Sequence, residues 1–481
     1  MTTKCVVRVF EHSELICGDA LKSWQIVWHK GPLDDSRRRD LCNKIIAALK
    51  KRYDDFARIS QRERHQLWRK CDETSAGALR CPFYELTCHR GKDGIKFGHY
   101  VGQLSFDGYQ VEVLPKADRK EADGNEADRW QSHLLDMLCV ACDLPLQATG
   151  QSRQTHRGSV VLDIFLNRFL HEVAKLLRRG LVKRYRKVAR NRTALKGRLL
   201  FARQISRNMV HRERFFTESD EYDYEGVLNR ILYSALQLTG EIAISGDIRT
   251  RARGLAFDFP EVSDIAVDEA TFSRITYDRK TVDYRFGISL AKLILLHAMP
   301  TLRSGREELI AMMFDMNRLW EVFVAKLAKK FVTTIPETNT IKIESQETKL
   351  FWRKDGRQKK RKTIRPDIVI GNGKETLAVW DTKWKTPDEI ASDADLKQMF
   401  VYHLYWNTTK TALLYPNDGG REDIFGSFVD IPILVDMNSE PRKHKCSMRF
   451  LQIDDESAEF SFGKRWVDGR MKAWFGQGGF P

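Results

Sequence analysis

The sequence has 481 residues, 42% of them hydrophobic and 10% aromatic, and these values exclude a disordered or collagen-like chain. At about 150 residues per domain, the length suggests about three domains. The 81 Lys and Arg residues exceed the 65 Asp and Glu residues by 16. This excess leaves two readings open, an anionic partner such as nucleic acid or an ordinary solvated basic surface.

The sequence contains no signal for a membrane or a disulfide framework. It has no apolar run of about 18 residues, and its first residues lack the apolar region of a signal peptide. Nine scattered cysteines do not form a disulfide pattern, and the CxxC pair Cys139 and Cys142 lies in an apolar helical run that indicates core packing. We therefore expect a reduced, cytoplasmic protein that does not contact a membrane.

Residues 1–116 predict an N-terminal mixed α/β domain that is strand-rich from residue 81. A helix is predicted over 37–56, where Leu41, Ile45 and Leu49 follow a helical stripe. From Cys81 the apolar runs are short and alternate, and the Asp107-Gly108 pair between two of them predicts a hairpin. Residues 117–128 contain no large apolar side chain and predict a linker or exposed loop.

Residues 129–305 predict a helical region. Apolar residues recur with the helical period over 134–144, 160–177, 224–243 and 286–299, and again over 315–332. A basic run with interleaved aromatic residues covers 178–203, where Gly180 and Gly197 suggest turns around a packed segment.

Residues 306–481 predict a third domain. After residue 340 the apolar period changes to two, which predicts strands over 341–352, 363–370 and 376–384. A helix over 391–406 and a strand over 410–416 follow. Together with the helix over 315–332, this order predicts an α/β sheet flanked by helices.

Two carboxylates and a lysine form the sharpest chemical signal. Asp367 follows Pro366 and precedes an apolar strand, and Asp381 and Lys383 share one face at the end of the next strand. Buried charges need a partner or a metal ion. Two carboxylates that hold Mg²⁺ beside a lysine suit phosphodiester hydrolysis, because the metal polarises the phosphate and the ammonium stabilises developing charge.

The alternative is a structural ion pair between Asp381 and Lys383. Short Asp and Lys patterns also recur by chance, since Pro387-Asp388 is followed by Asp395 and Lys397. That second pattern falls in a loop and a helix, where residues two apart face in different directions.

Two helices add candidate site residues. Gln398 and Tyr402 lie four residues apart on the helix after the second strand, on one face with Asp395, although simple solvent exposure also explains a polar face. Glu321 interrupts the apolar stripe of the preceding helix and is either solvated or a further carboxylate for the metal.

The turn between the first two strands of this sheet is strongly basic. Residues 353–365 contain eight basic residues and one acid, including Lys359, Lys360, Arg361 and Lys362. The turn is either a solvated hairpin tip or, beside a phosphate-cleaving site, a contact to the DNA backbone that gives affinity without sequence choice.

The residues around Asp367, Asp381, Lys383, Gln398 and Tyr402 resemble the site of PD-(D/E)xK nucleases with a trailing QxxxY helix. The rest of the chain, from about 100 to 416, resembles the McrC family, the nuclease subunits of McrBC-type, modification-dependent restriction systems. Six segments carry this second resemblance: 111–116, 180–188 with 195–201, 227–236, 314–327 and 413–416.

The resemblance implies an N-terminal mixed α/β adaptor, a helical partner-binding middle and a C-terminal PD-(D/E)xK α/β nuclease. It implies a DNA endonuclease in which Asp367 and Asp381 bind Mg²⁺, or alternatively Mn²⁺, and Lys383 assists the attacking water. Gln398 and Tyr402 would order the site, and Glu321 would be a further catalytic residue.

The implied partner is a McrB-like AAA+ ring, a GTPase or ATPase, that binds the region before about residue 300 and hydrolyses nucleotide faster when it does. The strands and hairpin at 82–115 could supply an element that projects into the ring. The alternative is that this half of the chain is only a platform for double-stranded DNA.

Two other functions stay open, a non-cutting activator of an AAA+ motor and a stand-alone DNA repair nuclease. The sequence contains no GxxxxGK[ST] loop, so the chain is not itself a P-loop motor.

Overall fold

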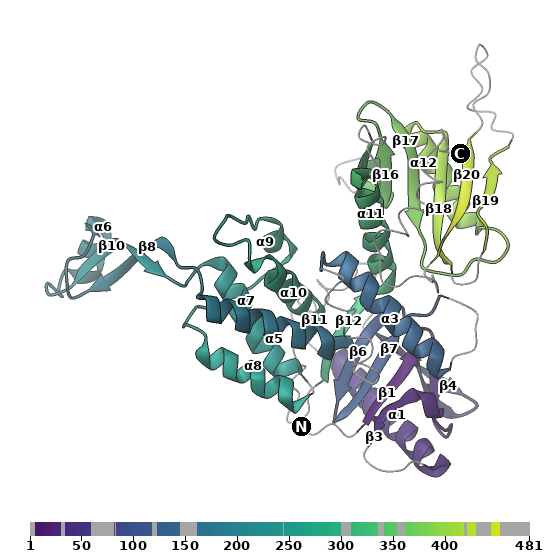
Figure 1. The fold of residues 1–481 in the computed structure, drawn as a ribbon, viewed down its shortest axis with the longest axis horizontal. Coiled ribbons are helices and arrows are strands. Elements are labelled where there is room, and N and C mark those ends of the chain that lie inside the picture. Colours follow the sequence, from purple (N-terminus) through teal and green to yellow (C-terminus); the bar gives the residue numbers. More distant parts are fainter. Residues whose placement is uncertain are drawn as a thin grey trace. The chain divides into compact units, whose positions relative to one another are not determined.

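The computed structural model describes residues 5–29, 34–58, 81, 83–117, 123–144, 161–243, 245–299, 309–334, 341–353, 361–417, 421–429 and 444–452 (Figure 1). The chain forms two compact units. Unit 1 is mainly Ser159–Thr301, and unit 2 combines Thr3–Gly158 with Leu302–Pro481. The fold is mixed α/β with several sheets, as the sequence predicted, whereas the exact domain boundaries stay a prediction.

The N-terminal part of unit 2 contains a mixed sheet. In it β12 (Leu309–Asp315), β6 (Tyr100–Phe106), β7 (Tyr109–Leu114), β1 (Cys5–Phe10) and β3 (Ile26–His29) are successive neighbours. The predicted hairpin is confirmed, since Phe106 pairs with Tyr109 and both Asp107 and Gly108 have the positive φ that such a turn requires. A smaller sheet consists of β2 (Glu14–Ile16), β5 (Lys92–Phe97) and β4 (Tyr84–His89), with α1 (Asp35–Arg58) packed beside it.

The central strands of the mixed sheet are buried on both faces, so Arg8, the charged residue within β1, needs partners. Arg8 is 5% exposed and binds Glu112 of the neighbouring strand at 2.8 Å and Asp128 of α3 (Gly124–Ala141) at 2.7 Å. Helix α3 corrects the prediction of a loop over 117–128 from residue 124 on, whereas 118–122 lie outside the described residues. Asp123 caps the N-terminus of α3 by accepting a hydrogen bond from the backbone amide of Glu126. The polar residues after Asp123 therefore form the first turn of a helix.

The C-terminal part of unit 2 is a six-stranded sheet in the order β13, β16, β17, β18, β20, β19. These strands span Lys342–Ser345, Ile368–Gly371, Thr376–Thr382, Lys410–Asn417, Lys445–Gln452 and Ile424–Ser427. β17, β18 and β20 are parallel, and β16 runs antiparallel to β17. Helix α12 (Asp393–Trp406) packs on one face, and α11 (Met316–Thr334) contacts β13 and β17.

The predicted strands over 341–352 and 363–370 are each two strands, which corrects the sequence prediction. The chain changes direction at Gln346, whose φ is 61°, and at Pro366. The outer pieces, β14 (Lys349–Arg353) and β15 (Arg361–Ile364), therefore form a hairpin of their own. The inner pieces, β13 and β16, join the large sheet.

Unit 1 has a helical core. It contains α5 (Val161–Arg179), α7 (Val227–Ile242), α8 (Gly246–Asp258), α9 (Glu269–Ser273) and α10 (Tyr284–His297). The apolar stripes of α5, α7 and α10 are buried against one another, which confirms the helical prediction for these segments.

An arm extends from this helical core (Figure 1). It comprises β8 (Arg184–Arg192), β9 (Arg198–Leu199), α6 (Phe201–Asn208) and β10 (Phe215–Asp223), in the strand order β8-β10-β9. β8 is exposed along most of its length, so the basic run over 178–203 is a projecting strand and not a packed segment. Of the segment 82–115, which the sequence suggested as a projecting element, residues 83–115 lie within the two N-terminal sheets of unit 2 and the turns between their strands.

Candidate active site

The candidate site lies where β16 and β17 meet the N-terminal turns of α12. In β17 the side chains of Val379 and Asp381 point to the face covered by α12, because strand residues alternate between faces. Val379 is fully buried, and Asp381 is 3% exposed. Lys383 follows the strand directly, and its amide donates to the carbonyl oxygen of Leu414 at 2.9 Å, which fixes the backbone at this position.

Asp381 and Lys383 form a buried ion pair, with Nζ 2.7 Å from Oδ2. The pKa of Asp381 is raised to about 7, first by burial and then by the nearby Asp367 carboxylate, against the opposing effect of Lys383. Burial by itself lowers the pKa of Lys383, but the carboxylate of Asp381 outweighs it and the net pKa is raised. Lys383 is therefore a permanent cation in this site.

Asp367 is held by the residue between Asp381 and Lys383. The backbone amide and the hydroxyl of Thr382 both donate to Oδ2 of Asp367, at 2.6 and 2.7 Å. The other carboxylate oxygen of Asp367 makes no hydrogen bond within the described residues. Thr382 was not predicted, although its position inside the Asp-x-Lys pattern was the available signal.

Gln398 and Tyr402 connect α12 to both carboxylate-bearing strands. Nε2 of Gln398 donates to the Tyr402 hydroxyl at 2.8 Å, while its Oε1 accepts from Lys383 at 3.1 Å. The Tyr402 hydroxyl lies 3.1 Å from the carbonyl oxygen of Arg365 and 3.5 Å from Oδ1 of Asp381. These two side chains thus face the site and are not simply solvated.

Asp395 is a further acidic residue beside Lys383. The sequence predicted that it shares a helix face with Gln398 and Tyr402, but did not predict it as a site residue. Its oxygens lie 3.5 Å from Nζ of Lys383 and 2.6 Å from Nζ of Lys385. Ser392, the N-cap of α12, donates to the same carboxylate at 2.7 Å. Asp395 therefore holds both lysines at the end of β17.

Glu321 of α11 reaches the edge of the site. Its Oε1 accepts a hydrogen bond from the side-chain amide of Gln346 at 2.7 Å. The backbone amide of Gln346 donates to the backbone carbonyl oxygen of Asp367 at 3.2 Å. Burial raises the pKa of Glu321, and the carboxylate of Asp367 adds to the rise. The carboxylate of Asp367 thus raises the pKa of both Glu321 and Asp381, and such a gathering of acidic groups is costly unless a cation joins them.

The donor set fits Mg²⁺. Within the described residues, no three acidic, histidine or cysteine side chains are arranged to hold a metal ion by themselves. Mg²⁺ usually takes one or two carboxylates and completes its shell with water and substrate phosphate, so the carboxylates of Asp367 and Asp381 would be enough hard oxygen ligands to hold it.

Arg361 and Lys362, two of the predicted DNA-binding residues, lie exposed on β15. Lys359 and Lys360 lie outside the described residues.

Among the helices that the structure describes, none combines the length and apolar character needed to cross a bilayer.

A tryptophan after the site connects it to the N-terminal sheet. The Trp384 indole donates to Oε1 of Glu11, which follows β1, at 2.7 Å. Its ring packs against Trp130 of α3 and Trp320 of α11, with centroids 6.1 and 5.3 Å away. Glu11 is 4% exposed, and burial raises its pKa to about 8 even though Trp384 and the amide of Lys116 donate to it.

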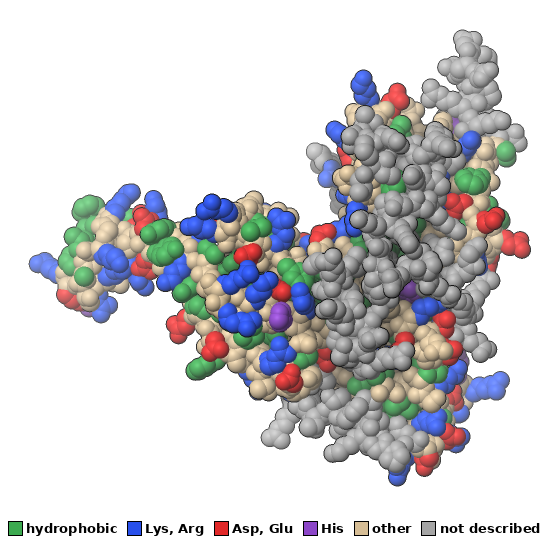
Figure 2. Space-filling model, viewed as in Figure 1, with side chains coloured by type: hydrophobic (Ala, Val, Ile, Leu, Met, Phe, Trp, Pro, Cys, Tyr) green, Lys and Arg blue, Asp and Glu red, His purple; other side chains and the backbone are tan. Residues whose placement is uncertain are grey.

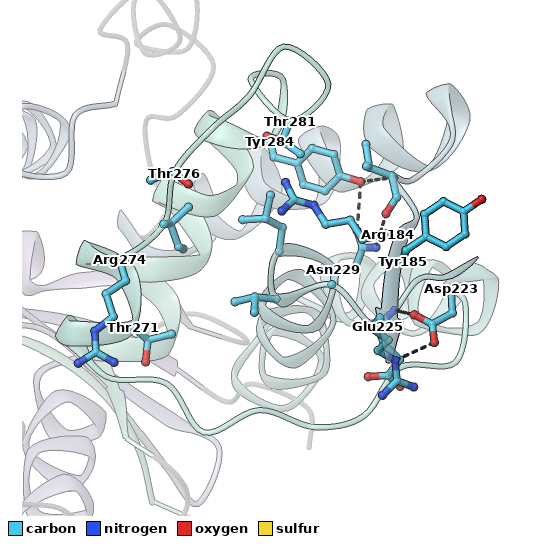
Figure 3. A pocket seen from close by; sticks show the side chains of 16 residues that line it. Arg184, Tyr185, Asp223, Glu225, Asn229, Thr271, Arg274, Thr276, Thr281 and Tyr284 are labelled. Atoms are coloured by element: carbon cyan, nitrogen blue, oxygen red, sulfur yellow. Dashed lines mark hydrogen bonds and ion pairs between the residues drawn. The ribbon is translucent and has the colours of Figure 1, made fainter. Parts of the chain in front are cut away.

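Hydrogen bonds hold the base of the arm, where β8 and β10 leave unit 1, against the helical core (Figure 3). The Asn229 amide of α7 donates to the carbonyl oxygens of Val182 and Tyr224 at 3.0 and 2.9 Å, one on each leg of the arm. Tyr284 of α10 donates to Asn229 and accepts from the amide of Val182. A cavity of about 490 Å³ lies beside these hydrogen bonds.

The family of the chain follows from its sequence match. The model of the family described as McrBC 5-methylcytosine restriction system component matches residues 95–416, two thirds of the chain. The chain belongs to this McrBC restriction family. The predicted resemblance to the McrC family of McrBC-type restriction systems is thereby confirmed.

A curated relative supports the assignment to the McrBC family. The Escherichia coli (strain K12) protein named Type IV methyl-directed restriction enzyme EcoKMcrBC is 25% identical over 187 residues. The match covers 38% of this chain and 54% of the relative, so the chain spans about half the length of that protein.

A solved structure has a similar fold. It is described as a refined half-complex from a tetradecameric assembly of Thermococcus gammatolerans McrB AAA+ hexamers with bound McrC. The TM-score is 0.56 at 18% sequence identity, and the match covers 97% of this chain and 99% of that chain.

Proposed function

We propose that the chain is the Mg²⁺-dependent, PD-(D/E)xK-type DNA endonuclease subunit of a McrBC-like restriction complex. The single observation that carries this proposal is the meeting of Asp367 and Asp381 beside Lys383, at the ends of adjacent strands, in a chain of a restriction family. A structural ion pair needs one carboxylate, whereas in this site the carboxylate of Asp367 raises the pKa of both Asp381 and Glu321.

Asp367 and Asp381 would bind Mg²⁺, which polarises the scissile phosphate and lowers the pKa of water. Lys383 stays protonated because its pKa is raised, so its ammonium stabilises negative charge that develops on the phosphate and does not accept a proton. Water attacks phosphorus as it loses a proton to the solvent, the bond to the leaving sugar oxygen breaks, and that oxygen takes up a proton from the solvent.

Gln398 and Tyr402 act as positioning residues in this proposal. Gln398 bridges Lys383 and the Tyr402 hydroxyl, which fixes the ammonium relative to Asp381. Because the catalytic benefit of such a site depends on holding groups to within about 1 Å, this bridge limits the freedom of the lysine.

Asp381→Asn tests the nuclease proposal, with Asp393→Asn as the matched control. Asp393 lies exposed in the first turn of α12, so its variant makes the same change outside the site. We expect Mg²⁺-dependent cutting of plasmid DNA to be lost with Asp381→Asn and kept with Asp393→Asn. Unchanged cutting by Asp381→Asn would overturn the proposal.

We further propose that the arm of unit 1 binds a McrB-like AAA+ partner. Its outer part exposes apolar side chains that are 58% to 86% accessible: Leu195, Phe201, Ile205, Met209 and Val210. Figure 2 shows hydrophobic and basic side chains together over this part of the molecule. Such a surface is typical of protein interaction sites.

The charges of the arm argue against the alternative of a DNA platform. Arg186 pairs with Asp223 at 2.8 Å, and Arg190 and Arg192 both pair with Glu221 of the neighbouring strand. The basic run is therefore partly neutralised within the arm itself, which leaves the apolar tip as its distinctive feature.

The dependence of cutting on the partner separates the remaining alternatives. We expect the chain alone to cut DNA poorly and to cut in the presence of its AAA+ partner, whose nucleotide hydrolysis it raises. Equal cutting without the partner would indicate a stand-alone nuclease. Raised hydrolysis without cutting would indicate a non-cutting activator.

A further inference from the structure

Strand β14 exposes three consecutive apolar side chains. Leu350, Phe351 and Trp352 are 50%, 47% and 53% exposed. The register with β15 shifts between Leu350 and Trp352, which makes Phe351 the extra residue of a β-bulge. Bulges re-aim side chains and are common beside active sites, and three exposed apolar residues in a row are costly unless they have a function.

The hairpin formed by β14 and β15 is anchored to the candidate site through both of its ends. Before β14, Gln346 binds Glu321 and the carbonyl oxygen of Asp367. After β15, the carbonyl oxygen of Arg365 accepts a hydrogen bond from the Tyr402 hydroxyl. The hairpin is therefore fixed by the same side chains that surround the carboxylates.

The near side of the hairpin packs on the end of α12. Lys349 donates to the carbonyl oxygen of Tyr405 at 2.9 Å and lies over the ring of Trp406. Tyr405 donates to the carbonyl oxygen of Phe351 at 3.2 Å. These contacts hold the hairpin in place. The Phe351 ring also packs against Tyr405, with centroids 5.8 Å apart, and all three apolar side chains stay about half exposed.

Lys349 of the hairpin pairs with Glu347 at 3.9 Å, whereas the other cations in its described residues have no such partner. Arg353, Arg361 and Lys362 make no ion pair within the part of the chain that the structure describes. Arg353 and Arg361 are direct cross-strand partners, and Lys362 lies opposite Trp352. An apolar segment flanked by unpaired cations is complementary to a nucleic-acid groove lined by phosphates.

We propose that Leu350, Phe351 and Trp352 enter a groove of duplex DNA beside the cleavage site, while Arg353, Arg361 and Lys362 bind the flanking phosphates. This inference rests on the proposed DNA cleavage. Apolar side chains inserted between base steps unstack them and bend the duplex, which widens the contact with the protein. The hairpin would thus hold a deformed duplex against Asp367 and Asp381.

The chain length between hairpin and site limits where this contact falls. Lys362, opposite Trp352, precedes Asp367 by five residues, which span at most about 18 Å. At 3.4 Å per base pair, the backbones of Lys362 and Asp367 are at most about five base pairs apart along a duplex, so the hairpin would contact the DNA near the cut phosphate.

The test measures DNA binding and base unstacking separately, with the full-length protein. Fluorescence anisotropy gives the affinity for a labelled duplex at several salt concentrations, and duplexes with 2-aminopurine at successive positions report unstacking. The variants are Trp352→Ala, Trp352→Phe and the double variant Arg361→Gln with Lys362→Gln. The control is Phe425→Ala, which removes an exposed aromatic ring from β19.

We expect Trp352→Ala to weaken binding about tenfold and to abolish the 2-aminopurine signal, as loss of a base–aromatic contact does. Its salt dependence should not change, and Trp352→Phe should restore most of both signals. The double variant should instead lower the slope of log affinity against log salt by about 2. Phe425→Ala should behave as the unaltered protein.

Unchanged affinity and unstacking in Trp352→Ala would overturn the inference, as would a loss of partner association without any loss of DNA binding. If either result is found while the unaltered protein still cuts DNA, only the inference about the hairpin fails and the proposed function stands. If the unaltered protein with its AAA+ partner neither binds nor cuts duplex DNA, the proposed function itself fails.

Discussion

Glu11→Gln should change how the stability of unit 2 depends on pH. The side chain is almost fully buried, and Gln keeps the oxygen that accepts from Trp384 and Lys116. The pKa of Glu11 rises from 4.5 to about 8 on folding. Between these values the folded protein holds a proton that the unfolded chain has released, so this group's contribution to stability is present below pH 4.5 and is lost as pH rises to 8.

The expected magnitude follows from about 1.4 kcal/mol for each pKa unit. Between pH 5.5 and 8, the free energy of unfolding of the unaltered protein should fall by about 3 kcal/mol relative to Glu11→Gln. Urea unfolding at several pH values measures it, and tryptophan fluorescence is a suitable probe because Trp384 and its neighbouring tryptophans pack together. The exposed Glu85→Gln is the control. A difference that does not vary with pH would refute the reasoning.

Changing residues 359–362 to Ala should weaken DNA binding uniformly across sequences and lower the slope of log affinity against log salt by about 3 to 4. Titrations at several salt concentrations measure it, and an unchanged slope would mean that the turn is only a solvated hairpin tip. Tyr402→Phe should reduce cutting at least tenfold by freeing Gln398, with DNA affinity unchanged, and equal cutting rates would remove Tyr402 from the site. Phe201→Asp with Ile205→Asp should abolish the rise in the partner's nucleotide hydrolysis while DNA binding is kept, whereas an unaltered rise would exclude the arm tip as the partner surface.

The sequence predicted those features that depend on local pattern. The period of two along 376–384 placed Asp381 and Lys383 on one face, and the structure pairs them. The Asp107-Gly108 turn was visible because few residues adopt positive φ at two successive positions. The stripes of α5, α7 and α10 were visible because each buries one face.

Features that depend on long-range contacts could not be predicted. Trp384 reads as one more apolar residue of a strand, and only the fold brings it to Glu11, more than 370 positions earlier. Strand β14 continues the alternation of β13 without a sequence break, so the separate hairpin was missed. The basic run over 178–203 contains interleaved apolar and aromatic residues and therefore resembles a packed segment, and the acidic partners of β8 on β10 are about thirty residues away.

The two lysines at the end of β17 allow the most direct test of the nuclease site. Lys383 and Lys385 both pair with Asp395, but only Lys383 contacts Asp381. The measurement is the rate at which the chain with the proposed AAA+ partner cuts duplex DNA in Mg²⁺. The account predicts that Lys383→Met abolishes cutting and that Lys385→Met cuts within a few-fold of the unaltered protein. Equal cutting by the two variants would contradict it.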